Sequence, residues 1–387
     1  MSYEWIATAA FGLEGVVAQE LRALGLTDVH AGNGGARFAA TSLEAFCANL
    51  WLRCADRVLL HCGSFEAATF DQLFEGVRAL PWADWIPRLG AFPVAGKCVR
   101  AQLMSVSDCQ AITKKAIAEK LKARYKTDWL PETGEAYPVE VSVRGTQAVI
   151  TMDASGMALN RRGYRTWNGE APLRETLAAA LVTLSPWRPG RLLHDPTCGT
   201  GTILIEAAMR AAGRAPGLTR AFACEQWGFL DRSAFPEARA EAKARFQPDA
   251  INAMGGISGS DIDGAALKLA ARHVEQAGFG KRIVFTQRDA AELRMPGQDG
   301  VFLCNPPYGE RLGDRAAAEK VYRALAGLLR QHPGWNLGAL SAHPGFERCL
   351  GRRADKKRRL YNGRLECEWM TFLPQKTNKK DGLLPGV

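Results

Sequence analysis

RLLHDPTCGTGTILIEAA, residues 191–208, carries the strongest fold signal in the chain. Its apolar run ends at Asp195, a turn with Gly199 and Gly201 follows, and a helix-forming segment begins directly afterwards. This order is typical of nucleotide-binding sheets, because glycine lets the backbone approach a ligand closely. Since Asp195 would repel a pyrophosphate, the turn favours a ligand with a cationic amino-acid end, such as S-adenosylmethionine. A purely structural turn is the alternative.

The segments around this turn alternate between apolar strands and amphipathic helices from Thr176 onward. ISGSD, IVFTQRD and GVFLCN read as strands, and the segments between them have apolar residues at helical spacing. This alternation predicts an α/β fold with a mainly parallel, doubly wound sheet. Residues 211–256 exceed the usual length of such a connection, so we expect an insertion there with helices of its own.

Acidic residues end two of the predicted strands. Asp261 ends ISGSD and is placed to accept hydrogen bonds from ribose hydroxyls. It lies 66 residues after Asp195, and the insertion explains that distance. Asp289 ends IVFTQRD and is placed to take a hydrogen of an adenine amino group. Helix capping is the alternative for Asp289, and it is the favoured interpretation for Asp263.

NPPYGERLG begins at Asn305 and follows the apolar strand VFLC. Both prolines fix φ and remove a backbone donor, so the tetrapeptide is rigid. The Asn305 carboxamide oxygen and the Pro306 carbonyl can then accept the two hydrogens of an exocyclic amine, and Tyr308 offers a face for a base. A simple proline turn is the alternative, but the shared sheet with the glycine turn argues against it.

Basic residues gather in local patches, although the whole chain carries only a net charge of +10. Residues 111–126 hold six basic side chains and one glutamate, and residues 351–387 hold 10 basic and 4 acidic ones. Such patches favour contact with a polyanion, and a solvated helix face is the alternative. Residues 157–175, with arginines, Tyr164 and Trp167, suit either phosphate contact or a simple connector.

The front part of the chain reads as small α+β units. A strand at 5–11, a helix over 12–25 that ends at Gly25 and a glycine turn into a strand come first, and then a helix with Ser42 as its N-cap. Further on we expect a helix up to Pro81, a strand, the basic helix and a hairpin that turns at 144–147.

Composition excludes several other classes of protein. Hydrophobic residues make up 47% of the chain, and none of its apolar runs approaches the ~20 residues of a membrane span. We therefore expect a soluble protein of the cytoplasm that does not contact a membrane. The ten cysteines form no CxxC pair and no zinc-type cluster, so we expect reduced thiols and no metal.

Together DPTCGTG, SDID and NPPYGERLG resemble the motifs of class I S-adenosylmethionine-dependent methyltransferases that act on amino groups. The front half, with NRRGYR, APLRETLAAAL and KKRRLYNGRLEC, resembles the THUMP-domain RNA methyltransferases that make N2-methylguanosine. The resemblance spans about residues 3–374 and is nearest to the bacterial type that methylates a guanine in 23S ribosomal RNA. It implies a Rossmann-like class I methyltransferase domain preceded by a ferredoxin-like α+β domain and a THUMP RNA-binding domain.

The domain boundaries that we expect are 1–63 for the ferredoxin-like domain, 64–156 for the THUMP domain, 157–175 for a linker, 176–375 for the methyltransferase domain and 376–387 for a flexible tail. Some relatives carry a second methyltransferase domain. This chain ends soon after the first, so we do not expect a second activity.

The resemblance implies that a methyl group moves from S-adenosylmethionine to the N2 amine of guanine, without a general base. The expected catalytic residues are Asn305, Pro306, Pro307 and Tyr308. The expected cofactor contacts are Asp195, Pro196, Cys198, Gly199, Gly201, Asp261, Asp289 and Asn305. The expected RNA contacts are Lys114, Lys115, Lys120, Lys122, Lys126, Arg161, Arg162, Arg165, Lys356, Lys357, Arg358 and Arg359.

Three other functions stay open at this point. A transfer RNA guanine-N2 methyltransferase shares every motif. A DNA adenine methyltransferase also uses Asn-Pro-Pro-Tyr, but the THUMP-like front half argues against it. A non-catalytic RNA-binding factor of ribosome assembly would be free to lose the cofactor motifs, and this chain retains them.

Overall fold

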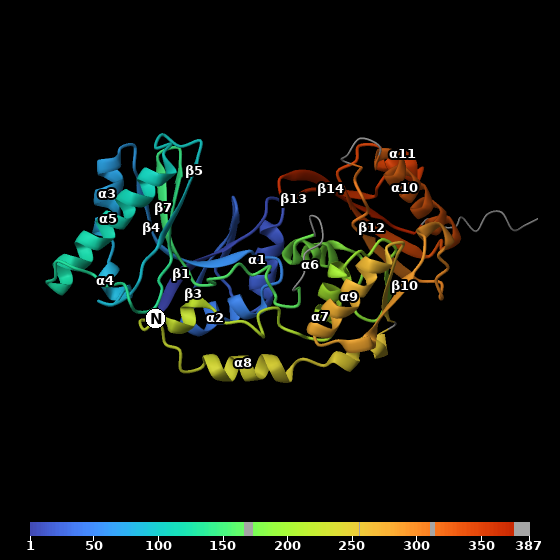
Figure 1. Ribbon diagram of the computed structural model, residues 1–387, viewed down its shortest axis with the longest axis horizontal. Coiled ribbons are helices and arrows are strands. Elements are labelled where there is room, and N and C mark those ends of the chain that lie inside the picture. Colours follow the sequence, from blue (N-terminus) through green and yellow to red (C-terminus); the bar gives the residue numbers. More distant parts are fainter. Residues whose placement is uncertain (166–172, 255, 310–313, 375–387) are drawn as a thin grey trace, which may run out of the picture. The chain divides into compact units, whose positions relative to one another are not determined.

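The computed structural model describes residues 1–165, 173–254, 256–309 and 314–374 (Figure 1). Two compact units make up the chain: residues 1–162 with 215–245, and residues 163–214 with 246–387. The expected tail, 376–387, lies outside the described residues, as does Trp167. Among the described helices there is none long and apolar enough to cross a membrane.

The first unit is built on one seven-stranded sheet in the order β2-β3-β1-β4-β7-β6-β5. All neighbours are antiparallel except β5 and β6. The strands are β1 Ser2–Thr8, β2 Val29–Gly32, β3 Gly35–Thr41, β4 Arg57–Glu66, β5 Val94–Val99, β6 Val139–Arg144 and β7 Gln147–Asp153. Because β4 pairs with both β1 and β7, the segments expected as ferredoxin-like and THUMP domains share this sheet.

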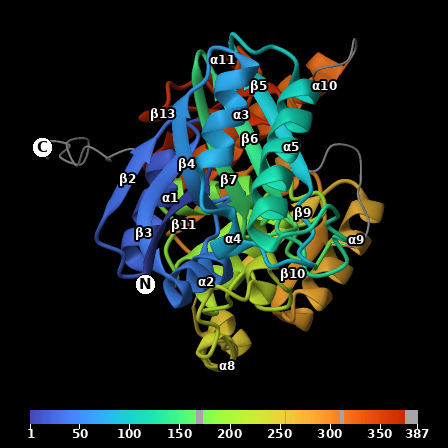
Figure 2. The same ribbon diagram turned by 90° about the vertical axis from the view of Figure 1, so that its left-hand side faces the viewer.

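Helices cover the first unit's sheet. They are α1 Glu14–Ala23, α2 Ser42–Trp51, α3 Phe70–Ala79, α4 Trp82–Trp85, α5 Val106–Tyr125, η1 Ala223–Gln226 and α8 Phe235–Ala244. Figure 2 shows α3 and α5 side by side, and they pack against each other. The predicted basic helix is α5, and it buries Ala116, Ile117 and Leu121. Its lysines are therefore carried on the remaining surface.

Thr41, and not Ser42 as predicted, caps α2. Its hydroxyl accepts the Glu44 N–H at 3.3 Å, and the Glu44 carboxylate accepts the Thr41 N–H at 2.7 Å. This reciprocal capping box satisfies two donors that the helix itself cannot satisfy. The Ser42 hydroxyl instead accepts the N–H of Asp231 at 3.2 Å, so it joins α2 to a distant segment.

The predicted insertion does carry helices, and residues 215–245 belong to the first unit. Phe235 stacks on Phe46 with ring centroids 4.3 Å apart. Trp227 stacks on Tyr137 and donates its indole N–H to the Ala136 carbonyl at 3.1 Å. These buried aromatic contacts explain why the chain returns to this unit before it completes the second.

The second unit holds a sheet in the order β10-β9-β8-β11-β12-β14-β13. The first five strands in this order are parallel, which confirms the predicted doubly wound sheet. The strands are β8 Leu192–Asp195, β9 Ile257–Asp261, β10 Ile283–Gln287, β11 Gly300–Cys304, β12 Trp335–Ser341, β13 Lys356–Asn362 and β14 Leu365–Phe372. The antiparallel pair β13–β14 was not predicted.

The strand order reverses between β8 and β11. From β8 the sheet continues through β9 to β10, and from β11 it continues through β12 in the other direction. Ligands of open α/β sheets bind outside the carboxyl ends of the strands at such a switch point. The helices of this unit are α6 Glu175–Leu184, α7 Thr202–Ala211, η2 Pro248–Met254, α9 Gly264–Gln276, η3 Gly280–Arg282, η4 Ala290–Glu292, α10 Asp314–Gln331 and α11 Phe346–Leu350.

Candidate active site

The ends of β8, β9, β10 and β11 open into one cleft of about 830 Å³. Residues that follow each of these four strands line it, and so do residues from the start of α10. The predicted site residues that it brings together are Pro196, Asp261, Asp289, Asn305, Pro306, Pro307 and Tyr308. The structure thus gathers one set of side chains from positions that are up to 112 residues apart in the sequence.

Asp195 anchors the glycine turn from within the protein. Its side chain is 2% exposed, and it accepts the Thr197 N–H at 3.0 Å. Burial and, secondarily, the nearby Asp261 carboxylate raise the pKa of Asp195 well above its usual value. A buried carboxyl next to a second carboxylate is stabilised when a cation approaches the pair.

The glycine turn leaves its backbone open. Gly199 has a φ of 51°, and a Cβ built there would meet no atom within 4 Å. Gly201, with a φ of 78°, is the N-cap of α7. Cys198 was predicted to contact the cofactor. Its thiol is instead buried and packs on Gly259, and its N–H donates to the Ser260 carbonyl at 3.0 Å. Both groups of Cys198 are therefore engaged inside the protein and support the turn.

Asp261 joins the turn to the end of β9. One oxygen accepts the Gly199 N–H at 2.8 Å and the other accepts the Asp263 N–H at 3.0 Å. Each carboxylate oxygen has two lone pairs, so Asp261 keeps acceptor capacity towards the cleft. Asp263 caps α9 as predicted, with bonds to the N–H groups of Ala265 and Ala266.

Asp289 caps a short helix and also lines the cleft. One of its oxygens accepts the Ala291 N–H at 2.9 Å and caps η4, while the side chain lines the cleft. Ile262 is a further residue of the site, for which the sequence motifs predicted no role. It is 67% exposed and lines the cleft beside these acidic residues. An exposed branched apolar residue directly after a strand-end aspartate was the signal that could have revealed it.

Two hydrogen bonds hold the Asn-Pro-Pro-Tyr loop, one within the loop and one from α10. The Tyr308 hydroxyl donates to Asn305 Oδ1, and the hydroxyl of Tyr322 in α10 donates to the Pro307 carbonyl at 2.6 Å. Burial raises the pKa of Tyr308, so this hydroxyl stays protonated. The prediction assigned the Tyr308 ring to stacking and did not foresee its bond to Asn305. Residues 310–313, which continue the motif, lie outside the described residues.

Charge in the cleft is predominantly negative. Among the residues that the structure describes, Asp261, Asp289 and Asp314 line it together with one cation, Lys320. Asn362, from the end of β13, also lines it, although the sequence predictions gave this distant residue no role in the site. A cleft of this charge attracts a cationic ligand.

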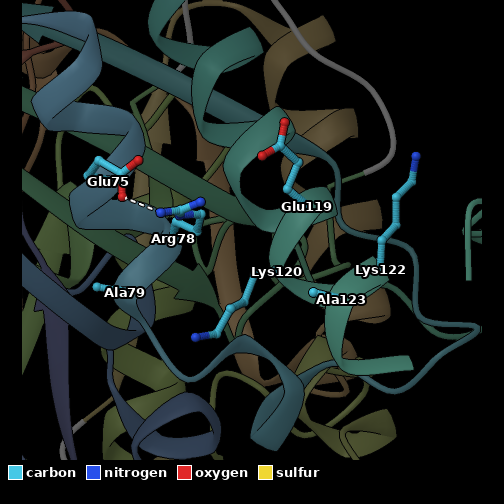
Figure 3. A pocket seen from close by; sticks show the side chains of 7 residues that line it. All are labelled: Glu75, Arg78, Ala79, Glu119, Lys120, Lys122 and Ala123. Atoms are coloured by element: carbon cyan, nitrogen blue, oxygen red, sulfur yellow. Dashed lines mark hydrogen bonds and ion pairs between the residues drawn. The ribbon is translucent and has the colours of Figure 1, made fainter. Parts of the chain in front are cut away.

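The basic helix contributes to a second hollow, a groove of about 660 Å³ between α3 and α5. Figure 3 shows Arg78 of α3 and Lys120 of α5 projecting towards the space between these helices. Arg78 was not predicted, and it pairs with Glu75 at 2.7 Å. Lys114 has a structural role instead, because its ammonium binds Glu132 at 2.5 Å and lies 3.6 Å from the Phe92 ring centroid.

The prediction that Arg162 and Arg165 contact RNA at the surface is wrong. Arg162 is 3% exposed and donates to the carbonyls of Arg53 and Leu159. Arg165 lies in the second unit, where it donates to Thr202 Oγ1 at 2.6 Å and lies 3.6 Å from the Glu175 carboxylate. Both guanidinium groups satisfy buried acceptors.

The run of cations from Lys356 to Arg359 is exposed along β13. Part of its charge is neutralised locally. Lys357 pairs with Glu347 at 2.6 Å and with Glu368 at 3.3 Å, and Arg359 pairs with Glu366 at 3.3 Å. The local charge is therefore smaller than the count in the sequence suggested.

Comparison with known proteins decides the family. Residues 162–371 match the model of the RMKL-like methyltransferase domain. Residues 4–59 match the RlmL ferredoxin-like domain, and residues 67–153 match the THUMP domain. The chain belongs to the RMKL-like methyltransferase family. The expected fold, a methyltransferase domain preceded by ferredoxin-like and THUMP domains, is confirmed.

Similar proteins span nearly the whole of this methyltransferase. "Putative RNA methyltransferase YpsC" of Bacillus subtilis is 43% identical over 380 residues, which cover 97% of this chain and 98% of the relative. A crystal structure named "a predicted N6-adenine-specific DNA methylase from Listeria monocytogenes" is 41% identical with a TM-score of 0.91, and 97% of each chain is covered. "SMU.472, a putative methyltransferase complexed with SAH" is 39% identical with a TM-score of 0.91, covering 97% of this chain and 99% of that one.

Proposed function

We propose that this methyltransferase transfers a methyl group from S-adenosylmethionine to the N2 amine of a guanosine in 23S ribosomal RNA. The observation that carries the proposal is the cleft that joins the Asn305–Tyr308 loop to the glycine turn. The THUMP match and the RNA methyltransferase name of the Bacillus relative support an RNA substrate. The RlmL-like first domain supports a ribosomal target.

The residues present fit S-adenosylmethionine. When bound, its sulfonium supplies an electrophilic methyl group. Asp261 provides negative charge for its cationic end, approach of that cation would favour ionisation of the buried Asp195 behind it, and the open backbone at Gly199 admits a ligand. Asp261 is suited to the ribose hydroxyls and Asp289 to the adenine amine, while Ile262 offers apolar surface to the ring. The complex of SMU.472 with SAH supports this assignment.

The loop is suited to an exocyclic amine. The lone pair of such an amine is delocalised into the base, so the amine is a poor nucleophile. Asn305 Oδ1 and the Pro306 carbonyl would accept its two hydrogens, turn its lone pair towards the methyl group and stabilise the developing positive charge. Oδ1 has two lone pairs, so it can keep its bond from Tyr308 during this contact. The thioether S-adenosylhomocysteine would be the leaving group, and the methylated amine would lose its extra proton to water, so no general base is assigned.

RNA would be held through its phosphates at exposed and half-buried cations of the first unit. Arg78, Lys115, Lys120 and Lys122 provide such charge on α3 and α5. Contacts of this kind position the RNA without reading its sequence. A paired guanine would have to leave its stack to reach the loop, since a duplex hides its amine.

Transfer of labelled methyl groups tests the function. The purified enzyme is incubated with labelled S-adenosylmethionine and unmodified 23S ribosomal RNA, transfer RNA or DNA, and the products are digested to nucleosides. We expect N2-methylguanosine in the 23S RNA alone. Label in transfer RNA, or N6-methyladenine in DNA as the name of the Listeria relative suggests, would contradict the proposed substrate. Absence of both transfer and cofactor binding would contradict the whole proposal.

A further inference from the structure

Tyr322 of α10 holds the Asn-Pro-Pro-Tyr loop from inside the protein. Its side chain is completely buried, and its hydroxyl donates to the Pro307 carbonyl at 2.6 Å. The ring packs against His343 and Phe346, at centroid distances of 5.4 and 4.7 Å. Burial raises the pKa of Tyr322 to about 12. The hydroxyl therefore keeps its proton at neutral pH and always can donate it.

Such a donor matters because the two prolines have no N–H. At positions 306 and 307 the carbonyls are the only backbone groups that can form hydrogen bonds. Each proline also restricts the residue before it to an extended conformation, so the segment from Asn305 to Pro307 is stiff. A stiff segment that is held at one carbonyl is held along its length. Fixing the Pro307 carbonyl therefore restrains the direction of the Pro306 carbonyl.

Ser341, at the carboxyl end of β12, orients Tyr322 in turn. Its Oγ lies 3.5 Å from the Tyr322 hydroxyl and accepts the His343 N–H at 3.1 Å. A tyrosine has one hydroxyl proton, and Tyr322 gives it to Pro307. Ser341 is then the donor between the two hydroxyls. The chain from Ser341 through Tyr322 to Pro307 connects the loop to a fully buried strand.

We propose that Tyr322 is a positioning residue for methyl transfer. By holding the Pro307 carbonyl, it aims the Pro306 carbonyl and the Asn305 carboxamide at the target amine. The inference rests on the proposed function. It predicts a defect in rate and not in affinity, because misplacement of reacting groups by about 1 Å can cost about a hundredfold in rate.

Tyr322→Phe tests this, since it keeps the ring and removes only the hydroxyl. We expect the single-turnover rate at saturating RNA to fall at least about tenfold, with cofactor Kd and RNA KM within about twofold of wild type. Tyr125→Phe is the matched control, because the Tyr125 hydroxyl donates to the Ile86 carbonyl at 2.7 Å in the first unit. Its rate at saturating RNA should equal that of the wild type.

A wild-type rate in Tyr322→Phe, or a parallel loss of cofactor affinity, would overturn the proposal. If this variant does not fold, Ser341→Ala provides the test: its rate must fall, and an unchanged rate overturns the inference. If the wild type methylates another nucleic acid, the proposed function is wrong and the same comparison is made on that acceptor.

Hydrogen exchange distinguishes the remaining case, in which the wild type methylates no nucleic acid. Tyr308 and Gly309 carry the amides that follow the two prolines. Faster exchange of these amides in Tyr322→Phe, measured without cofactor or RNA, would support the hold on the loop. Equal exchange in the two proteins would overturn it, independently of the failed methyl transfer.

Discussion

Asn305 is the residue on which the proposed chemistry depends. Its Oδ1 already accepts a bond from Tyr308, and the side chain faces the cleft. Asn305→Ala removes an acceptor of the target amine, so kcat should fall by about 10²–10³-fold, the usual effect of losing one group that stabilises transition-state charge. Calorimetry should still detect cofactor binding. Asn33→Ala, at an exposed turn of the first unit, is the control. Full activity of Asn305→Ala would refute this assignment.

His194 makes the second unit sensitive to acid. Its ring nitrogens lie 2.8 and 3.1 Å from the hydroxyls of Ser258 and Ser260, and burial lowers its pKa to about 4. Between pH 6.5 and 4 the unfolded histidine binds a proton that the folded one does not, so stability falls as the pH falls through this window. The lost free energy of unfolding should approach about 3 kcal/mol.

Urea denaturation at pH 7 and pH 4 measures this effect, with His194→Gln as the comparison. The variant lacks the titrating ring, so its stability should change less between the two pH values. Asp195 acts in the opposite direction, because its raised pKa favours the folded state at low pH, and it is present in both proteins. Equal pH dependence of the two proteins would show that His194 does not contribute.

Helices and strands whose apolar residues recur at a regular spacing were predictable from the sequence, and those without such a spacing were not. The β8–turn–α7 unit and α5 appear where the apolar spacing predicts them. β12 was missed because WNLGALS is buried on both faces and does not alternate. β13 was missed because KKRRLYN begins with four exposed cations, which read as a phosphate-binding run. Its ion pairs with glutamates of β14 and α11 are visible only in three dimensions.

Arg165 illustrates how an element can change the interpretation of a charge. The sequence predicts a phosphate contact, but the guanidinium binds Thr202, in the first turn of α7, and lies near Glu175 of α6. Arg165→Ala should therefore lower the melting temperature by several degrees, as loss of a buried charge pair does. The salt dependence of RNA binding should not change. Arg161→Ala, at an exposed position, is the control for the melting temperature and should leave it unchanged. If Arg165→Ala instead kept its melting temperature and reduced the salt dependence of RNA binding, the predicted phosphate contact of Arg165 would be restored.

At the scale of the molecule, contacts between distant segments limit what a sequence can predict. The insertion was expected from its length, but its return to the first unit depends on stacking of Phe235 on Phe46. The groove between α3 and α5 likewise adds Arg78 to a cationic surface that the sequence assigned to α5 alone. Neither pairing has a local signal, because each side chain is ordinary within its own helix.

The groove gives the last prediction, which concerns the whole RNA-binding surface. If Arg78 and Lys120 contact phosphates, the variant Arg78→Glu/Lys120→Glu should bind RNA more weakly, since both changes remove a cation and add a carboxylate. The slope of log K against log salt concentration should fall by about 0.7–0.9 for each lost contact. Lys243→Glu/Arg245→Glu, two exposed charge reversals at the C-terminal end of α8, make the same change in total charge and should reduce affinity far less. Filter binding between about 50 and 200 mM salt measures both quantities. An unchanged slope in the double variant would exclude this groove from the RNA contact, and the phosphate-binding surface would then have to lie elsewhere.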